Sequence, residues 1–146
     1  EKVEIDNLIV LVKANEVAQQ LALPLPMTAK GNVELSIIHA DIDLTNENQC
    51  STTNGEITWF KAGVIALDQN VKLGELDGKI SCEKGALALL LSPDNNLGLT
   101  FNAYLRNGRI SGNGFLKPGA EFPVGLNSAL PFLGRKDTQG RYRLSF

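Results

Sequence analysis

Apolar and polar residues alternate with a period of two along most of the chain, and helical spacing is rare. The clearest stretch is 97–106, where apolar side chains at odd positions alternate with small or polar ones. Such alternation is typical of a β-strand with one buried and one exposed face. Asn107-Gly108 follows directly and favours a type I′ turn, because both positions of that turn need a positive φ. The pattern predicts an antiparallel hairpin over residues 96–117.

The parity of the apolar positions changes inside two other predicted strands. Apolar residues are odd-numbered from Val33 to Ile37 and even-numbered from Ala40 onward, and a second change follows at Trp59-Phe60. A β-bulge or a tight bend shifts parity in this way, so we expect strongly curved strands. The predicted fold class is all-β and mainly antiparallel, with a strongly curved or twisted sheet that can form an open half-barrel.

Two short helices interrupt this pattern. Asn15 is a candidate N-cap for a helix with apolar residues on one face as far as position 22. A second brief helix is predicted between Phe122 and Leu133, where leucines recur at helical spacing. A run without a polar face, Leu87 to Leu91, predicts a strand that is covered on both sides.

The two cysteines, Cys50 and Cys82, lie too far apart in sequence for a C-x-x-C metal or redox motif. Cys82 shares the parity of Leu76 and Ile80, so its side chain should point toward the core. The residues alone leave two alternatives open. Either the cysteines form a single disulfide bridge, or both are buried free thiols.

Composition limits the possible partners. The chain has 146 residues, is 43% hydrophobic and carries a net charge of −2, which suits one domain over residues 1–146 with an apolar core. A net charge of −2 gives no electrostatic indication that the protein binds nucleic acid or an anionic membrane surface. Runs such as Leu8–Val12 are far shorter than the roughly 18 to 20 residues of a membrane helix. Since the chain begins at Glu1, without Met or a signal peptide, we expect it to be either a mature product or part of a longer protein.

Catalytic and cofactor motifs are not recognisable. The single histidine, His39, shares a strand parity with Asp41 and Asp43, which is ordinary for an exposed strand. The glycines at 108, 112 and 114 do not have the spacing of a nucleotide-binding loop. We therefore predict that the protein is not an enzyme and that it uses no cofactor or metal.

The C-terminal stretch "LPFLGRKDTQGRYRLSF" is the most distinctive segment. Residues 137–140 predict a turn that Arg135 and Asp137 could bridge, and residues 141–146 predict a strand with Tyr142, Leu144 and Phe146 inward. Two interpretations are open: a structural staple for the C-terminus, or a docking surface for another subunit. The candidate residues are Phe132, Leu133, Gly134, Arg135, Asp137, Gly140, Arg141 and Tyr142.

Three features carry a resemblance to a known family. They are "LALPLPMTAKGNVELSI", the cysteine-bearing pair "ENQCSTTNGEITW" and "LGELDGKISCEKGAL", and the C-terminal stretch, which together span most of residues 21–146. In order and spacing they resemble the periplasmic part of protein N of the general, or type II, secretion pathway (GspN). The sequence departs from the family pattern at Lys136, where relatives tend to have proline, and at Gln49, where they tend to have an aromatic residue.

The resemblance implies a non-enzymatic accessory or scaffold component of the type II secretion system. It implies a periplasmic domain, attached to the inner membrane of a Gram-negative bacterium by an N-terminal helix that this chain lacks. It also implies partners among the other secretion subunits, and a disulfide between Cys50 and Cys82. A more distant resemblance, to AsmA-like envelope proteins with grooved sheets, implies an alternative function, the binding of a lipid or other hydrophobic ligand in a groove.

Overall fold

The computed structural model describes residues 2–20, 26–43 and 50–145. Eight strands form one antiparallel sheet in which each strand pairs with the next along the chain. A short helix, α1 (Ala14–Ala18), follows the first strand, and a 3₁₀ helix, η1 (Val124–Leu133), precedes the last. The strands are β1 (Lys2–Lys13), β2 (Met27–Asp43), β3 (Cys50–Ala66), β4 (Gln69–Glu83), β5 (Ala86–Leu91), β6 (Leu99–Arg106), β7 (Arg109–Leu116) and β8 (Tyr142–Ser145). The predicted fold class is confirmed.

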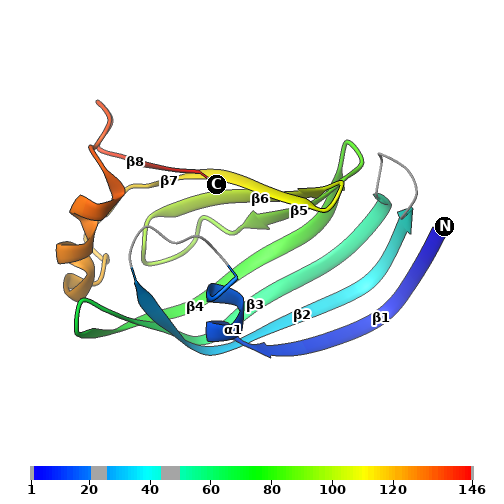
Figure 1. Cartoon of the computed structure of the whole chain (residues 1–146), viewed down its shortest axis with the longest axis horizontal. Coiled ribbons are helices and arrows are strands. Elements are labelled where there is room, and N and C mark those ends of the chain that lie inside the picture. Colours follow the sequence, from blue (N-terminus) through cyan, green and yellow to red (C-terminus); the bar gives the residue numbers. More distant parts are fainter. Residues whose placement is uncertain (1, 21–25, 44–49, 146) are drawn as a thin grey trace.

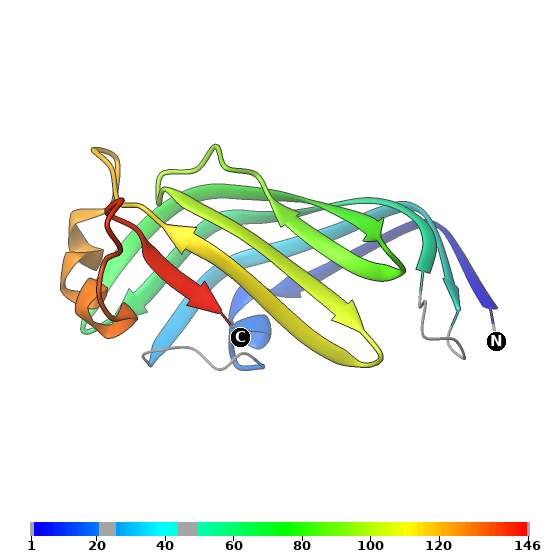
Figure 2. The ribbon, with the colours of Figure 1, turned by 90° about the horizontal axis from the view of Figure 1, so that it is seen from above.

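The sheet is strongly curved, so that β5 to β8 lie above β1 to β4 (Figure 1). It is not closed into a barrel among the described residues, because β1 and β8 are its two edges. The helix η1 lies at one end of the molecule and the N-terminus at the other (Figure 2). We call the side of the sheet that carries the buried apolar clusters the concave face, and the opposite side the outer face.

The two predicted parity changes are confirmed. At each of them the structure has a register irregularity in the pairing of the long strands. The pairing of β2 with β3 shifts between Ile37 and His39, and the pairing of β3 with β4 shifts between Trp59 and Ala62. A third irregularity, at Gly31, was not predicted. Its φ is +88°, and a Cβ there would lie 2.2 Å from the carbonyl oxygen of Phe60, so only glycine fits. These bulges give the sheet its curvature.

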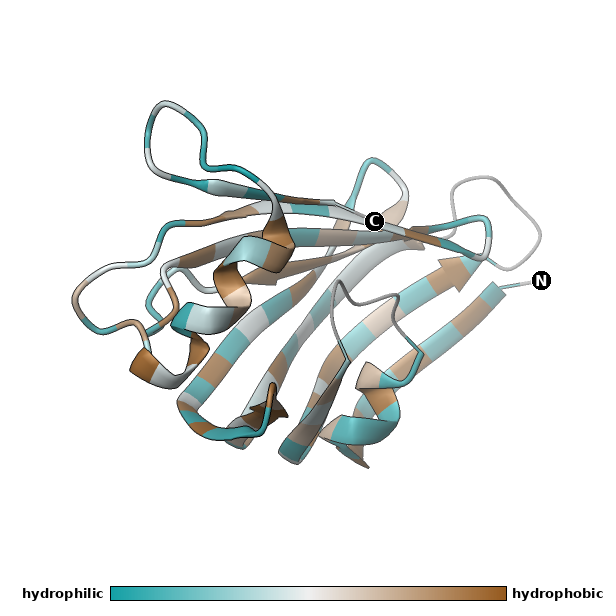
Figure 3. Cartoon of the chain, turned by 60° about the vertical axis from the view of Figure 1, so that its left-hand side comes forward, coloured by the Kyte–Doolittle hydropathy of each residue, from teal (hydrophilic) through white to brown (hydrophobic). Residues whose placement is uncertain are grey.

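The predicted hairpin is confirmed as β6 and β7, joined by Asn107 (φ 52°) and Gly108 (φ 73°). Cys82 is half-buried and follows the buried Leu76 and Ile80 on the concave face of β4, as its parity predicts. The run from Leu87 to Leu91 falls in β5, which lies between β4 and β6. Apolar and polar stripes alternate along the strands (Figure 3).

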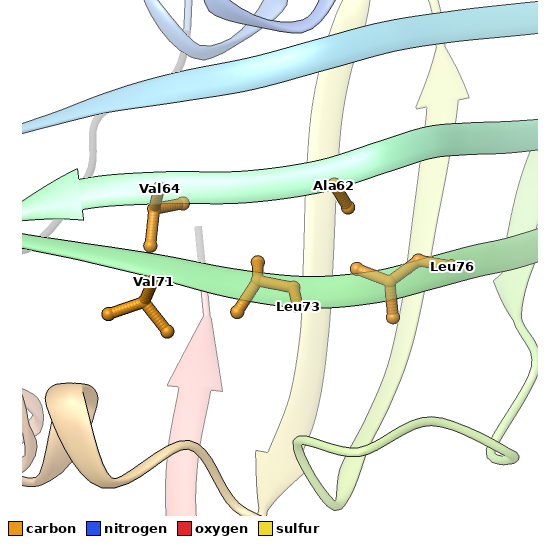
Figure 4. Close-up of a cluster of buried hydrophobic side chains, with 5 residues drawn as sticks. All are labelled: Ala62, Val64, Val71, Leu73 and Leu76. Carbon is orange, nitrogen blue, oxygen red and sulfur yellow. The ribbon is translucent and has the colours of Figure 1, made fainter.

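Two clusters of apolar side chains fill the concave face toward the η1 end. The first joins β3 to β4, and its buried members point to the same side of the sheet (Figure 4). The second joins β7, β8 and the loop before η1. Leu97 and Leu126 pack against both clusters and so connect them. The buried members are Ala62, Val64, Val71, Leu73 and Leu76 in the first, and Leu116, Phe122 and Tyr142 in the second.

The prediction that Asn15 caps a helix is wrong. The helix α1 begins at Ala14, two residues earlier than a helix capped by Asn15; its N-cap position is Lys13, and no side chain caps it. The Asn15 side-chain oxygen instead accepts a hydrogen bond of 3.1 Å from the backbone N–H of Ala29. The Asn15 side chain therefore joins α1 to β2 and does not cap the first turn of α1. The rest of the predicted helix, residues 21 and 22, lies outside the described residues.

Candidate functional site

The long edge of the sheet is the most unusual surface of the protein. β1 has 12 residues and pairs only with β2 among the described strands. Within residues 2–20, 26–43 and 50–145, no strand pairs with the backbone N–H and C=O groups on its other side. Natural sheets usually protect such an edge, because it is a ready template for another strand. The opposite edge, β8, has only four residues.

The side chains of β1 add to the exposure of this edge. Val10 and Val12 are half-buried on the concave face, whereas Ile9 is 67% and Leu11 is 65% exposed on the outer face. Ile38, in the neighbouring strand, is 57% exposed. Apolar side chains therefore lie on both faces of this edge strand. The sequence offered a signal for this, because Leu8–Val12 contains no polar residue, but we had not predicted an edge strand there.

An electrostatic contact holds β1 to β2 next to this surface. Asp6 of β1 lies directly opposite His39 of β2. The Nδ1 atom of His39 is 2.8 Å from a carboxylate oxygen of Asp6, and its Nε2 atom is 2.9 Å from Asp41. The Thr52 hydroxyl donates a 2.8 Å hydrogen bond to the same Asp41 oxygen. Sequence reasoning placed His39 and Asp41 on one parity but missed Asp6.

These contacts change the charge states of the cluster. Hydrogen bonds from His39 to Asp6 and then to Asp41 raise the pKa of the imidazole from 6.5 to about 9. The hydrogen bond with His39 and then that from Thr52 lower the pKa of Asp41. At neutral pH, His39 is therefore a cation held between two carboxylates.

A titration of His39 followed by NMR should have its midpoint near pH 9. Because the folded-state pKa is raised, the stabilisation is complete below about pH 6.5 and is lost as pH rises through about 9. Because the pKa of Asp41 is lowered, its part of this stabilisation is lost at the acid end, as Asp41 protonates. The variant Asp41→Asn should move the His39 midpoint toward 6.5, whereas Asp94→Asn, in a distant loop, should not. A wild-type midpoint near 6.5 would contradict the cluster.

One group of side chains has donor atoms close enough to surround a metal ion. In the described part of the chain it consists of Glu4, His39 and Asp41, whose ligand atoms lie within 4.8 Å of one another. The group lies on the outer face, and both His39 nitrogens already contact carboxylates. This arrangement is explained by the ion pairs between the strands, so we assign no metal site to it.

The disulfide between Cys50 and Cys82 is present, and the two Cα atoms are 6.0 Å apart. It joins the start of β3 to the end of β4, at the end of the molecule away from η1. Both cysteines are therefore used in the bridge, which rules out the alternative of two free thiols. An open groove of about 880 Å³ lies beside the bridge. Its lining mixes apolar Val3 and Ile42 with charged Lys2, Glu4 and Lys84.

The C-terminal candidate residues are divided between the interior and the surface. Tyr142 is buried, and Leu133 packs against the cluster around it. Phe132 is 53% exposed, and Gly134, at the end of η1, has a φ of 94°. Gly140 also has a positive φ, of 77°, within the predicted turn. The choice between a structural staple and a docking surface stays a prediction.

The prediction that Arg135 pairs with Asp137 is wrong, because Asp137 forms its ion pair with Arg141. The distance from Arg141 Nε to the Asp137 carboxylate is 2.8 Å, and the other carboxylate oxygen accepts the backbone N–H groups of Gln139 and Arg141. The Arg141 backbone N–H is the main cause of a lowered Asp137 pKa. The Arg141 guanidinium also lies 3.9 Å from the centre of the Phe115 ring in β7. Sequence spacing did not reveal this contact.

Comparison with known proteins identifies the family. Residues 1–145 match the family model described as type II secretion system (T2SS), protein N. The chain belongs to the protein N family of the type II secretion system. Its sequence is 33% identical over 135 residues to the type II secretion system protein N of Klebsiella pneumoniae, covering 90% of this chain and 52% of the relative. It is 26% identical over 139 residues to that of Vibrio cholerae serotype O1, covering 94% and 54%.

The family and these relatives are described as protein N of the type II secretion system. The chain spans about half the length of the curated relatives it matches. No solved structure matched it. Within the described ranges, none of the helices has the length and apolar character needed to cross a membrane.

Proposed function

We propose that this chain is a non-catalytic scaffold that binds other subunits of the type II secretion system through the unpaired edge of β1. The observation that carries the proposal is the edge itself, 12 residues long, with Ile9 and Leu11 about two-thirds exposed. A partner strand that pairs with β1 would satisfy its backbone groups and cover these side chains. Strand addition of this kind is a common mode of protein recognition.

The nucleophilic and basic groups support a non-catalytic role. Both nitrogens of His39 are bonded to carboxylates, so the imidazole has no free nitrogen with which to activate a nucleophile. The two cysteine sulfurs are joined to each other. The histidine and both cysteines are thus already engaged in contacts that join strands.

Binding of a lipid or another hydrophobic ligand is the alternative function. Packed apolar clusters occupy the concave face toward η1. The groove at the other end has charged side chains in its lining. Both features favour a protein-binding role over a lipid carrier.

We further propose that the protein works in the periplasm and is attached to the inner membrane by an N-terminal anchor in the longer protein. The disulfide supports the compartment, because structural disulfides persist in oxidising environments such as the periplasm. The length of the relatives is compatible with an additional segment. A domain over 1–146 that folds independently remains part of this proposal.

Site-specific photo-crosslinking in a bacterium with this secretion system would test the binding role. A photoreactive residue in place of Ile9 should form adducts with secretion subunits, because this side chain would be covered by the partner strand. The matched control is Ile110 on β7, which is 60% exposed and distant from β1 in the sheet order. Adducts at Ile9 no more abundant than those at Ile110 would contradict the proposal.

A further inference from the structure

Basic side chains gather where two turns of the sheet meet. Lys84 is in the turn between β4 and β5, whereas Arg106 and Arg109 flank the turn between β6 and β7. The two turns lie side by side in both views of the ribbon (Figure 1, Figure 2). All three cationic residues line one open groove of about 920 Å³, which we call the basic groove.

The two arginines of the basic groove oppose each other across the hairpin. Arg106 and Arg109 are direct partners in the pairing of β6 with β7, so their side chains leave the same face of the sheet at close range. Like charges in this position destabilise a strand pair. In the described part of the chain, no carboxylate forms an ion pair with Lys84, Arg106 or Arg109. An anion bound between them would relieve the repulsion.

The basic groove also has hydrogen-bond donors in a fixed arrangement. The Arg106 Nη2 atom donates a 3.0 Å hydrogen bond to the backbone oxygen of Lys84, and this contact joins the two turns. Tyr104 and Ser111 are the next opposed pair on the same face of the hairpin, and both line the groove. Guanidinium groups present parallel donors that match phosphate oxygens, and hydroxyl groups donate to the same oxygens. This set of donors suits a phosphate group.

The charge of the surrounding sequence favours an anion as well. Residues 95–120 include Arg106, Arg109 and Lys117 but no aspartate or glutamate. The net charge of −2 therefore conceals a basic region over β6 and β7. Such a local excess of positive charge raises the concentration of anions near the groove.

We propose that the basic groove binds a phosphate group between Lys84, Arg106 and Arg109, carried by a free phosphate compound or by the headgroup of an anionic phospholipid. The site goes beyond the proposed function and does not depend on the edge of β1. The strands β5, β6 and β7 each pair with a strand on both sides. An acidic peptide therefore has no free strand edge to join here, whereas a compact anion needs none.

Titration of the purified chain with inorganic phosphate, followed by amide NMR at low salt, tests the site. Saturable shifts should appear at Lys84, Asn107 and Gly108. Arg109→Gln should weaken binding by about tenfold or more, because a hydrogen bond between charged groups is lost. Its thermal unfolding midpoint should not fall, because the variant removes a repulsion; a purely structural role of this arginine would lower it. The matched control is Lys117→Gln, which removes the same charge outside the groove and should bind like the native chain.

Glu83 provides a variant with the opposite expected effect. Its carboxylate lines the basic groove and accepts a 3.2 Å hydrogen bond from the Ser81 hydroxyl. Glu83→Gln removes the negative charge and keeps an oxygen that accepts the same hydrogen bond. Phosphate should therefore bind about two- to fivefold more tightly, the usual effect of one charge at a protein surface. Weaker binding by this variant would contradict an anion in the groove.

Co-sedimentation with vesicles distinguishes the two sources of the phosphate. Binding to vesicles of phosphatidylglycerol and phosphatidylcholine, but not to phosphatidylcholine alone, would assign the site to a lipid headgroup if Arg109→Gln reduces it. Binding of inorganic phosphate without vesicle binding would assign it to a free phosphate compound. Binding of neither probe, or equal binding by Arg109→Gln and the native chain, would overturn the proposal. Binding of poly-glutamate alone would also overturn it and assign the groove to an acidic protein segment.

Discussion

Replacing both cysteines by alanine is expected to lower the free energy of unfolding by about 3–4 kcal/mol, the value of the chain-entropy model for a loop of this size. The bridge joins residues 32 positions apart and so restricts the unfolded chain strongly. Alanine is the suitable replacement, because Cys50 is only 4% exposed and a serine hydroxyl would be buried there. Denaturant unfolding of the wild-type chain and the double variant measures the difference.

Reduction provides the matched control for this prediction. A thiol reductant should destabilise the native chain by a similar amount and leave the Cys50→Ala/Cys82→Ala variant unchanged, because only the native chain has a bond to lose. Equal stabilities of the oxidised and reduced native chain would show that the bridge adds nothing. In that case the hydrogen bond from Cys50 N–H to Gly85 oxygen, 3.0 Å long, and the pairing of β3 with β4 would suffice to hold this end of the sheet.

Leu73→Ala should cost about 2–5 kcal/mol, the usual range for a large-to-small change in a packed core. Leu73 is 4% exposed and lies in the cluster that joins β3 to β4 (Figure 4). Its removal would leave a cavity between Val71 and Leu76 that the long, hydrogen-bonded strands cannot easily collapse to fill. The expected consequence is a lower midpoint of denaturant unfolding with an unchanged slope.

Ile110→Ala is the control for the core prediction. Ile110 also lies in a strand, but 60% of it is exposed, so its truncation should change stability by no more than about 0.5 kcal/mol. Similar losses from both variants would mean that the cluster at Leu73 is not closely packed. The concave face would then be open to a hydrophobic ligand, and the alternative of a lipid-binding groove would gain support.

The two kinds of experiment address different parts of the molecule. The disulfide bridge and the cluster around Leu73 both join β3 to β4, whereas the proposed binding surface is on β1. Variants of Ile9 and Leu11 should therefore alter association without altering the stability of the single chain. Variants of Cys50, Cys82 or Leu73 should do the reverse, provided that the sheet remains folded.

The sequence by itself determined the local backbone. Alternation located several of the strands but not β1, the Asn107-Gly108 pair determined the turn between β6 and β7, and the parity changes at 38 and 59–60 located two irregularities of the sheet. These features follow from neighbours in the chain, because the side-chain period of a strand and the φ preference of a turn residue act over a few positions.

Only the tertiary structure decided which distant groups meet. It brought Asp6 to His39 across 33 positions, and it joined α1 to β2 through a hydrogen bond between Asn15 and Ala29. It also left β1 as an edge with apolar side chains exposed. Such contacts depend on strand order and register, which are set by the packing of the whole sheet, and no short stretch of sequence contains that information.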